Sequence, residues 1–137
     1  MNAIVILSNR PVLVDADVLM WHLRGYAQVT RRLDQLDSRV LSSVSYLELL
    51  QGMRSKAELA ALKKMLERRM ATLLTISEPI TQRAPALMEL LTLSHGLQLG
   101  DALIAATALE HGLVVLTANV KRFSAVPGLT LDAFAPG

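Results

Sequence analysis

Short apolar runs alternate with segments of helical periodicity along this chain, and this alternation restricts the fold more than any other feature of the sequence. Residues 113–116 form a continuous apolar run after Gly112, which is typical of a strand covered on both faces of a parallel sheet. Residues 58–70 carry apolar side chains at helical spacing with charged side chains between them. The alternation predicts an α/β fold in which helices cover a central, mainly parallel sheet. We expect strands at residues 12–15, 39–43, 72–76, 113–116 and 129–132, and helices at residues 17–24, 27–36, 45–53, 58–70, 79–94 and 101–111.

The composition is that of one globular domain. With 137 residues, of which 52% are hydrophobic, the chain can bury a substantial core, and we expect a single domain over residues 1–137 with residues 1–10 as an extension. The absence of cysteine excludes disulfides, zinc–thiolate sites and a cysteine nucleophile, and it suits a cytoplasmic protein. Only 4% of the residues are aromatic, so base stacking on an aromatic platform is not expected. The longest apolar region, residues 102–118, is interrupted by Glu110 and His111 and is too short to span a membrane.

Acidic side chains gather where the expected strands end. Asp15 and Asp17 interrupt the apolar stretch VLVDADVLMW, and Glu48 and Asp101 lie near the starts of two helices. Ligands of open α/β sheets bind at the carboxyl ends of the strands, so these carboxylates are expected at one rim. Oxygen donors that converge there would suit a hard cation such as Mg²⁺ or Mn²⁺. Two further oxygen-bearing side chains follow the apolar run at 113–116, namely Thr117 and Asn119.

Most of these residues also have an ordinary structural explanation. Glu48 lies three residues after Ser45, and this spacing is typical of a capping box. Asp101, which follows Gly100, could be an ordinary helix N-cap. Asp17 could cap the first helix, and Asn119 could occupy a turn. Asp15 is the exception, because a carboxylate at a strand end between Val14 and Ala16 is expected to have no capping role. The joint placement at one rim favours a functional site.

Three segments in order resemble the motifs of PIN domains. VLVDADVLMW is similar to the family's opening strand, in which an Asp follows apolar residues, and SVSYLELLQGM is similar to its helix with a Glu before an apolar residue and a Gly. LGDALIAATALEHGLVVLTANVKRF resembles the block in which an Asp, an Ala-rich helix and an apolar strand lead to Thr-x-Asn/Asp. The resemblance covers residues 12–134. Within the family, the similarity is to VapC-type toxins, the ribonuclease half of bacterial type II toxin–antitoxin pairs.

The resemblance implies a three-layer α/β/α domain and a metal-dependent ribonuclease. Asp15, Glu48 and Asp101 would be the acidic metal-binding and catalytic residues, with Mg²⁺ or Mn²⁺ as the cofactor. Where the family often has a fourth acid, this chain has Asn119, and Asp17 supplies an acid that could partly compensate. The metal would orient and activate water for hydrolysis of an RNA phosphodiester. The partners implied are an RNA substrate and a cognate antitoxin.

The residues and the resemblance together lead to two expectations about partners. Helical apolar positions, including Leu87, Leu90, Leu91 and Leu93 with Leu74 nearby, exceed what a sheet of this size readily covers, and this predicts a homodimer, as the resemblance also implies. An inhibitor could pair with the acidic rim by inserting an Arg or Lys. The resemblance implies an antitoxin with a flexible tail, and we expect the apolar part of that tail along Leu47, Leu50 and Met53.

Other functions stay open at this point. An RNA-processing nuclease without an antitoxin would carry the same motifs, and so would a binding protein on the same fold that has lost its chemistry. The Asp-x-Asp string at Asp15 and Asp17 also occurs in haloacid-dehalogenase-like phosphatases, but those proteins need a late carboxylate pair, and none follows Leu116.

Overall fold

The five strands form a single sheet in which every neighbouring pair is parallel. The computed structural model describes residues 11–70 and 72–134, so the expected extension at residues 1–10 lies outside the described residues. The order across the sheet is β3-β2-β1-β4-β5. The expectation of a mainly parallel central sheet is therefore confirmed. The strands are β1 (Val12–Val14), β2 (Arg39–Ser42), β3 (Thr72–Leu74), β4 (Val114–Thr117) and β5 (Thr130–Ala133).

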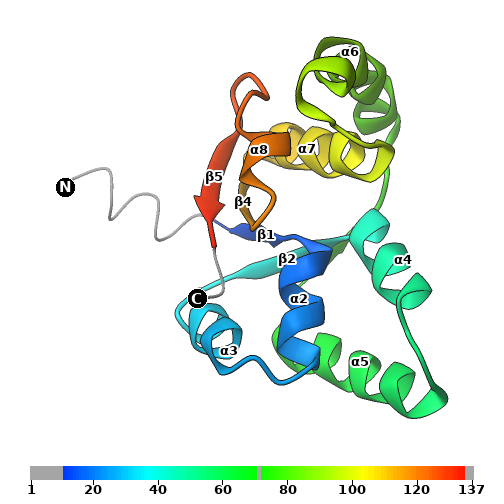
Figure 1. Cartoon of the computed structure of the whole chain (residues 1–137), viewed down its shortest axis with the longest axis vertical. Helices are drawn as coiled ribbons and strands as arrows, with labels where there is room; N and C mark the ends of the chain where they lie inside the picture. The colour runs from blue at the N-terminus through cyan, green and yellow to red at the C-terminus, as the bar shows by residue number, and fades with distance from the viewer. Residues whose placement is uncertain (1–10, 71, 135–137) are drawn as a thin grey trace.

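Helices cover both faces of this sheet and complete the three layers (Figure 1). Alternate residues of a strand point to opposite faces, so Leu13 packs into one core with α6 and α7 while Val12 and Val14 pack into the other with α2, α3 and α5. Strand β4 divides in the same way, with Val115 on the first face and Leu116 on the second. The helices are α2 (Ala16–Leu23), α3 (Ala27–Asp34), α4 (Ser43–Gln51), α5 (Lys56–Arg69), α6 (Glu78–His95), α7 (Leu99–His111) and the short α8 (Val120–Phe123).

Several element boundaries differ from the expected ones. Five helices begin one or two residues earlier than expected, because the residues that cap them lie further towards the N-terminus than the motifs suggested. Strands β4 and β5 both begin and end one residue later than expected, and the four-residue helix α8 was not anticipated. The corrected N-caps are Asp15, Ser42, Ser55, Ser77 and Gln98.

The strand order creates a crevice between β1 and β4. The chain runs from β1 outwards to β2 and β3, then returns across the sheet so that β4 pairs with the other side of β1. The connections after β1 and β4 therefore diverge at their carboxyl ends, which is where open parallel sheets place their ligands. The register Val14↔Leu116 brings the two strand ends level, and Asp15 N donates to the Leu116 carbonyl at 3.0 Å.

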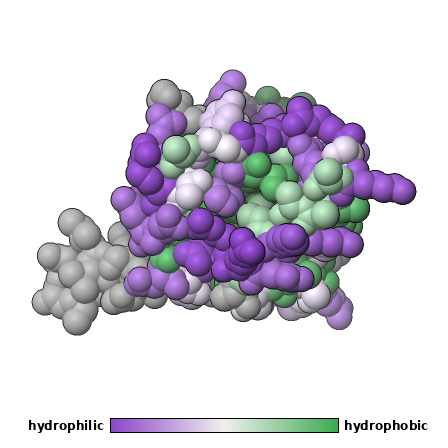
Figure 2. Space-filling model, turned by 90° about the horizontal axis from the view of Figure 1, so that it is seen from below, coloured by the Kyte–Doolittle hydropathy of each residue, from purple (hydrophilic) through white to green (hydrophobic). Residues whose placement is uncertain are grey.

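Several large apolar side chains are exposed on the surface. Figure 2 shows the face seen from below the view of Figure 1, the side on which α5 lies, and a hydrophobic patch there is bordered by hydrophilic side chains. The expected surplus of apolar positions on α6 is smaller than the sequence suggested, because Leu87 and Leu91 are buried in the core. Leu90 and Leu93 do face outwards, at 56% and 100% exposed. In the part of the chain that the structure describes, no helix has both the length and the apolar character that crossing a membrane requires.

Candidate active site

A polar cavity of about 320 Å³ opens where β1 and β4 end. Five of the six residues that the sequence singled out line it, and the sixth, Thr117, lies buried beside it and hydrogen-bonds to Asp15. The structure thus brings together residues that are more than a hundred positions apart in the chain. The lining consists of Asp15, Ala16, Asp17, Glu48, Gln98, Gly100, Asp101, Asn119 and Arg122.

Asp15 is the most buried of the acids and accepts only neutral hydrogen bonds in the described structure. It is 4% exposed, its Oδ1 accepts from Ala16 N at 2.8 Å, and its Oδ2 accepts from Thr117 Oγ1 at 2.7 Å. The expectation that Asp15 has no capping role was wrong, because it is the N-cap of α2. Burial raises the pKa of Asp15, the Thr117 and Ala16 hydrogen bonds oppose this rise, and the charges of Asp17 and Asp101 add to it.

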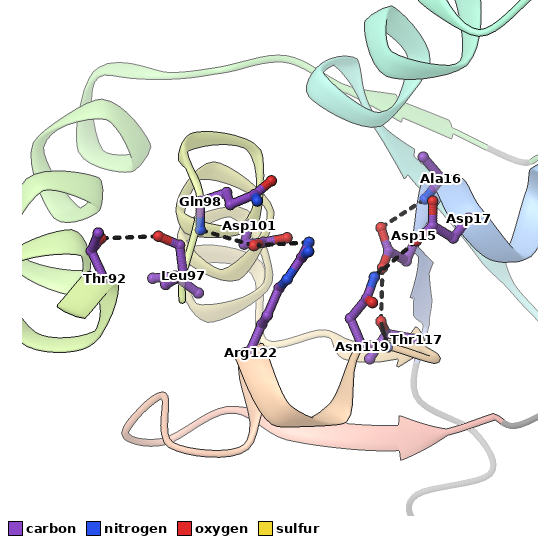
Figure 3. A network of polar contacts seen from close by, with 10 residues as sticks. All are labelled: Asp15, Ala16, Asp17, Thr92, Leu97, Gln98, Asp101, Thr117, Asn119 and Arg122. Carbon is purple, nitrogen blue, oxygen red and sulfur yellow. Dashed lines mark hydrogen bonds and ion pairs between the residues drawn. The ribbon is translucent and has the colours of Figure 1, made fainter. Parts of the chain in front are cut away.

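Thr117 and Asn119 hold the acidic end of α2 in place (Figure 3). The Thr117 hydroxyl donates to Asp15 and accepts from the backbone N–H of Asn119 at 2.9 Å. The Asn119 side-chain Nδ2 donates to Asp17 Oδ2 at 2.9 Å and to Asp15 Oδ2 at 3.5 Å. Asn119 is also the N-cap residue of α8, and therefore does more than occupy a turn. Here the amide supports two carboxylates as a hydrogen-bond donor.

Glu48 projects into the cavity from the middle of α4. The capping-box explanation was wrong, because Ser42 caps this helix and accepts from Ser45 N at 3.0 Å, which leaves Glu48 well past the first turn. Glu48 is exposed when the whole residue is considered, but its carboxylate lies against Gly100. A Cβ atom added to Gly100 would lie 3.0 Å from Glu48 Oε2, so a larger residue at position 100 would crowd the carboxylate. Removal from water raises the pKa of Glu48 to about 7, with further contributions from the charges of Asp15, Asp101 and Asp17, against a smaller lowering by Arg122.

Asp101 lies in the first turn of α7 rather than at its N-cap. Its Oδ2 accepts from Gln98 N at 2.9 Å, and Asp101 and Gln98 form a reciprocal capping box. Burial raises the pKa of Asp101, while the Gln98 hydrogen bond and the charge of Arg122 oppose this rise. One oxygen of Asp101 thus has a structural partner, so a capping role and a place at the cavity are compatible.

Arg122 is the residue that the sequence analysis missed. It lies on α8, and its Nη1 is 3.6 Å from Asp101 Oδ2 (Figure 3). The only signal in the sequence was its position three residues after Asn119, one turn along a helix too short to show periodicity. Sequence patterns drew attention to the acids and passed over a cation among them.

The donor set of the cavity suits a divalent metal ion. Four carboxylates surround a small polar space. Burial, together with mutual repulsion, raises the pKa of Asp15, Glu48 and Asp101, and a bound cation would lower these pKa values again. Within residues 11–70 and 72–134, no group of three or more His or acidic side chains already converges on one point. Among the residues that line the cavity, Asp15, Asp101 and Glu48 are side chains that could hold such an ion.

The raised pKa of Glu48 predicts how stability depends on pH. The folded chain holds this proton up to about pH 7, whereas the unfolded chain loses it near its ordinary value of 4.5. Between those values the folded state binds more protons, so its stability increases as the pH falls from about 7 towards 4.5. Thermal melting in the presence of a chelator should therefore show less acid stabilisation in Glu48→Gln than in the wild type. Glu89→Gln, which changes an exposed glutamate on α6, is the control, and equal pH profiles for all three proteins would contradict the assignment.

Comparison with known proteins gives the same result from sequence and structure. The PIN domain family model matches residues 12–129. Ribonuclease VapC10 of Mycobacterium tuberculosis (strain ATCC 25618 / H37Rv) is 35% identical over 132 residues, which cover 92% of this chain and 96% of the relative.

Two solved structures share the fold. The VapBC2 complex of Rickettsia felis, bound to a promoter DNA fragment, matches with a TM-score of 0.78 at 19% identity and covers 90% of this chain and 98% of the matched one. A toxin–antitoxin complex from Klebsiella pneumoniae matches with a TM-score of 0.70 at 25% identity and covers 87% and 95%. With a family model that spans most of its length and a curated relative at 35% identity, this chain belongs to the PIN-domain family, in its VapC ribonuclease group.

Proposed function

We propose that this protein is a metal-dependent endoribonuclease and the toxin of a toxin–antitoxin pair. The observation that carries the proposal is the cavity at the ends of β1 and β4, which is lined by Glu48, Asp101 and the buried Asp15. In the described structure, the hydrogen bonds to Asp15 come from neutral groups. A fold that places several carboxylates together loses stability unless a ligand compensates their charge. The likeness to VapC10, a ribonuclease, supports RNA as the substrate, and such a substrate would place the reaction in the cytoplasm.

The side chains would divide the work between holding the metal and fixing the site. Asp15, Glu48 and Asp101 would bind Mg²⁺ or Mn²⁺, and Thr117 and Asn119 would keep Asp15 and Asp17 in place through the hydrogen bonds described above. When bound, the metal supplies an activated water and neutralises charge that develops on the phosphate. In the reaction the water oxygen bonds to phosphorus, the bond from phosphorus to one sugar oxygen breaks, and that oxygen takes up a proton.

Asp15→Asn tests the catalytic assignment. The asparagine keeps an oxygen for Ala16 N and can donate to Thr117 Oγ1, so the fold should persist, while the lost charge should lower RNA cleavage by at least about 10²-fold. Cleavage of RNA with Mg²⁺ or Mn²⁺ is measured together with thermal melting. Asp37→Asn is the control, because it removes an exposed carboxylate from the turn before β2. Cleavage by Asp15→Asn at the wild-type rate would show that Asp15 is not part of the catalytic site.

The cleavage assay separates one alternative, and a test of toxicity on expression separates the other. A binding protein that has lost its catalytic activity would cleave no RNA with either metal. The presence of Asp15, Glu48 and Asp101 in the cavity argues against this alternative. A nuclease of RNA processing would cleave RNA but would not be toxic on expression. Relief of toxicity by a neighbouring reading frame would support the toxin.

An antitoxin tail has an apolar groove available next to the acidic cavity. A second hollow of about 320 Å³ is lined by Leu47, Ile76 and Leu99 and shares Glu48 and Gly100 with the first. Leu47 and Leu99 are 61% and 65% exposed. The path expected along Leu50 and Met53 is less suitable, because both pack against the core beneath α4. We therefore place the apolar part of the tail over Leu47, Ile76 and Leu99, with its basic residue in the acidic cavity.

Competition with metal tests this placement. If the basic residue and the cation share the carboxylates, rising Mn²⁺ should weaken inhibition of cleavage by the antitoxin. Leu47→Asp should also weaken binding of the antitoxin, because it puts a charge into the apolar groove. Leu73→Asp is the matched control, because Leu73 is an exposed leucine on β3 that lines neither this groove nor the acidic cavity. Inhibition that is indifferent to both Mn²⁺ and Leu47→Asp would contradict the model.

A homodimer is the remaining assembly that we propose, with the exposed leucines of α6 at the contact. Leu93 is completely exposed and Leu90 lies about one turn before it on the same face. Sedimentation at micromolar concentration should give twice the chain mass of 14.9 kDa, and Leu90→Lys with Leu93→Lys should shift the protein towards the monomer. A wild-type protein that sediments only as the monomer would contradict the dimer.

A further inference from the structure

Arg122 extends from α8 across the mouth of the acidic cavity. Figure 3 shows its side chain between Asp101 on one side and the Asp15–Asn119 group on the other. Among the described residues that line the cavity it is the one with a permanent positive charge, beside the four carboxylates. Among the described residues, its one ion pair is the 3.6 Å approach of Nη1 to Asp101 Oδ2. Most of the donors of the guanidinium are therefore available to another acceptor.

The ion pair explains little of the fold. The Arg122 side chain is 37% exposed, and ion pairs of such exposure and length contribute little to stability. Helix α8 is anchored instead by Phe123, which is fully buried in the core beneath α6 and α7. Asp101 already has a structural hydrogen bond from Gln98 N. A purely structural role thus leaves the position of Arg122 unexplained.

We propose that Arg122 binds a phosphate of the RNA at the cavity, and this inference rests on the proposed ribonuclease function. A phosphodiester is an anion, and the four carboxylates would repel it. A guanidinium at the rim offers an opposing charge and a planar pair of donors that matches two phosphate oxygens. Arg122 reaches the cavity from α8, whereas Glu48 and Asp101 reach it from α4 and α7, so one phosphate could contact Arg122 and also approach a cation held by the acids.

The placement also accounts for the weak contact with Asp101. An arginine held by a short, bidentate carboxylate contact would have to break strong bonds before it met a substrate. At 3.6 Å and partly exposed, Arg122 can leave Asp101 at small cost and turn to the phosphate. Asp101 keeps its Gln98 hydrogen bond when this happens, so the start of α7 is not disturbed.

The experiment compares Arg122→Gln, Arg122→Lys and Lys121→Gln with the wild type. Lys121 is the matched control, because it is the exposed neighbour on α8, carries the same charge and does not line the cavity. The measurements are kcat and KM for a short single-stranded RNA that the wild type cleaves, the Kd for that RNA in an Asp15→Asn background, and the melting temperature. Loss of a charge-assisted phosphate contact should raise Kd and lower kcat/KM by at least about tenfold in Arg122→Gln.

Each outcome separates this inference from its rivals. Weak binding by Arg122→Gln, partial recovery in Arg122→Lys and near wild-type behaviour of Lys121→Gln, with similar melting temperatures, would support it. Binding by Arg122→Gln equal to that of Lys121→Gln would overturn it. Faster cleavage by Arg122→Gln at limiting Mn²⁺ would also overturn it, since the guanidinium would then only compete with the metal. A loss of RNA binding that accompanies a much lower melting temperature would overturn it as well, because the variant would then be misfolded. If the wild type cleaves no RNA with either metal, the proposed function fails and the assignment of Arg122 fails with it, whereas equal cleavage by wild type and Arg122→Gln removes Arg122 alone.

Discussion

The hydrogen bond between Thr117 and Asp15 is the interaction on which the site depends. It joins the carboxyl ends of two adjacent parallel strands at 2.7 Å, and the same hydroxyl accepts from Asn119 N, so one side chain fixes the ends of β1 and β4 together with the start of α8. A buried carboxylate usually requires a paired cation or hydrogen bonds. Here the donors are a hydroxyl, an amide and a backbone N–H, all neutral. They offset part of the cost of burial and leave the negative charge of Asp15 uncompensated, which is the condition under which it can attract a cation.

The order of the strands makes this bond available. Only because β4 returns to pair with β1 does Thr117 lie beside Asp15, although the two are far apart in the chain. The same return leaves the connections at β1 and β4 running to opposite faces, so the space above the strand ends is not filled by a loop. Glu48 on α4 and Asp101 on α7 then complete the lining of that space. The acidic cavity is thus a consequence of the topology, and the individual acids need no unusual backbone: among the described residues, only glycines have positive φ.

Periodicity and apolar runs were enough to predict the strands, the long helices and the parallel sheet, because these features follow from which side chains must be buried. They could not give the strand order, which depends on pairing between distant segments. Capping was the weakest part of the prediction. Ser42 and Ser45 are both plausible caps by residue type, and only the geometry shows that Ser42 starts α4 and that Glu48 is free to face the cavity. Asp15 and Asp101 turned out to have structural and site roles together. Arg122 escaped notice because α8 is a single turn, and one turn has no period to read.

The cavity combines four carboxylates with one arginine among them, and this combination would suit an anionic substrate that is handled with a cation. Carboxylates alone would attract a metal and repel a phosphate, while a basic pocket would do the reverse. Burial and, to a smaller extent, the charges of the neighbouring acids raise the pKa of Glu48 to about 7. Arg122 opposes this rise slightly from the rim without forming a tight pair with Asp101. Because Arg122 is held only weakly by Asp101, its charge would stay available to a phosphate while the carboxylates stay available to a metal ion. On this proposal, metal and phosphate could occupy the cavity together, and neither would exclude the other.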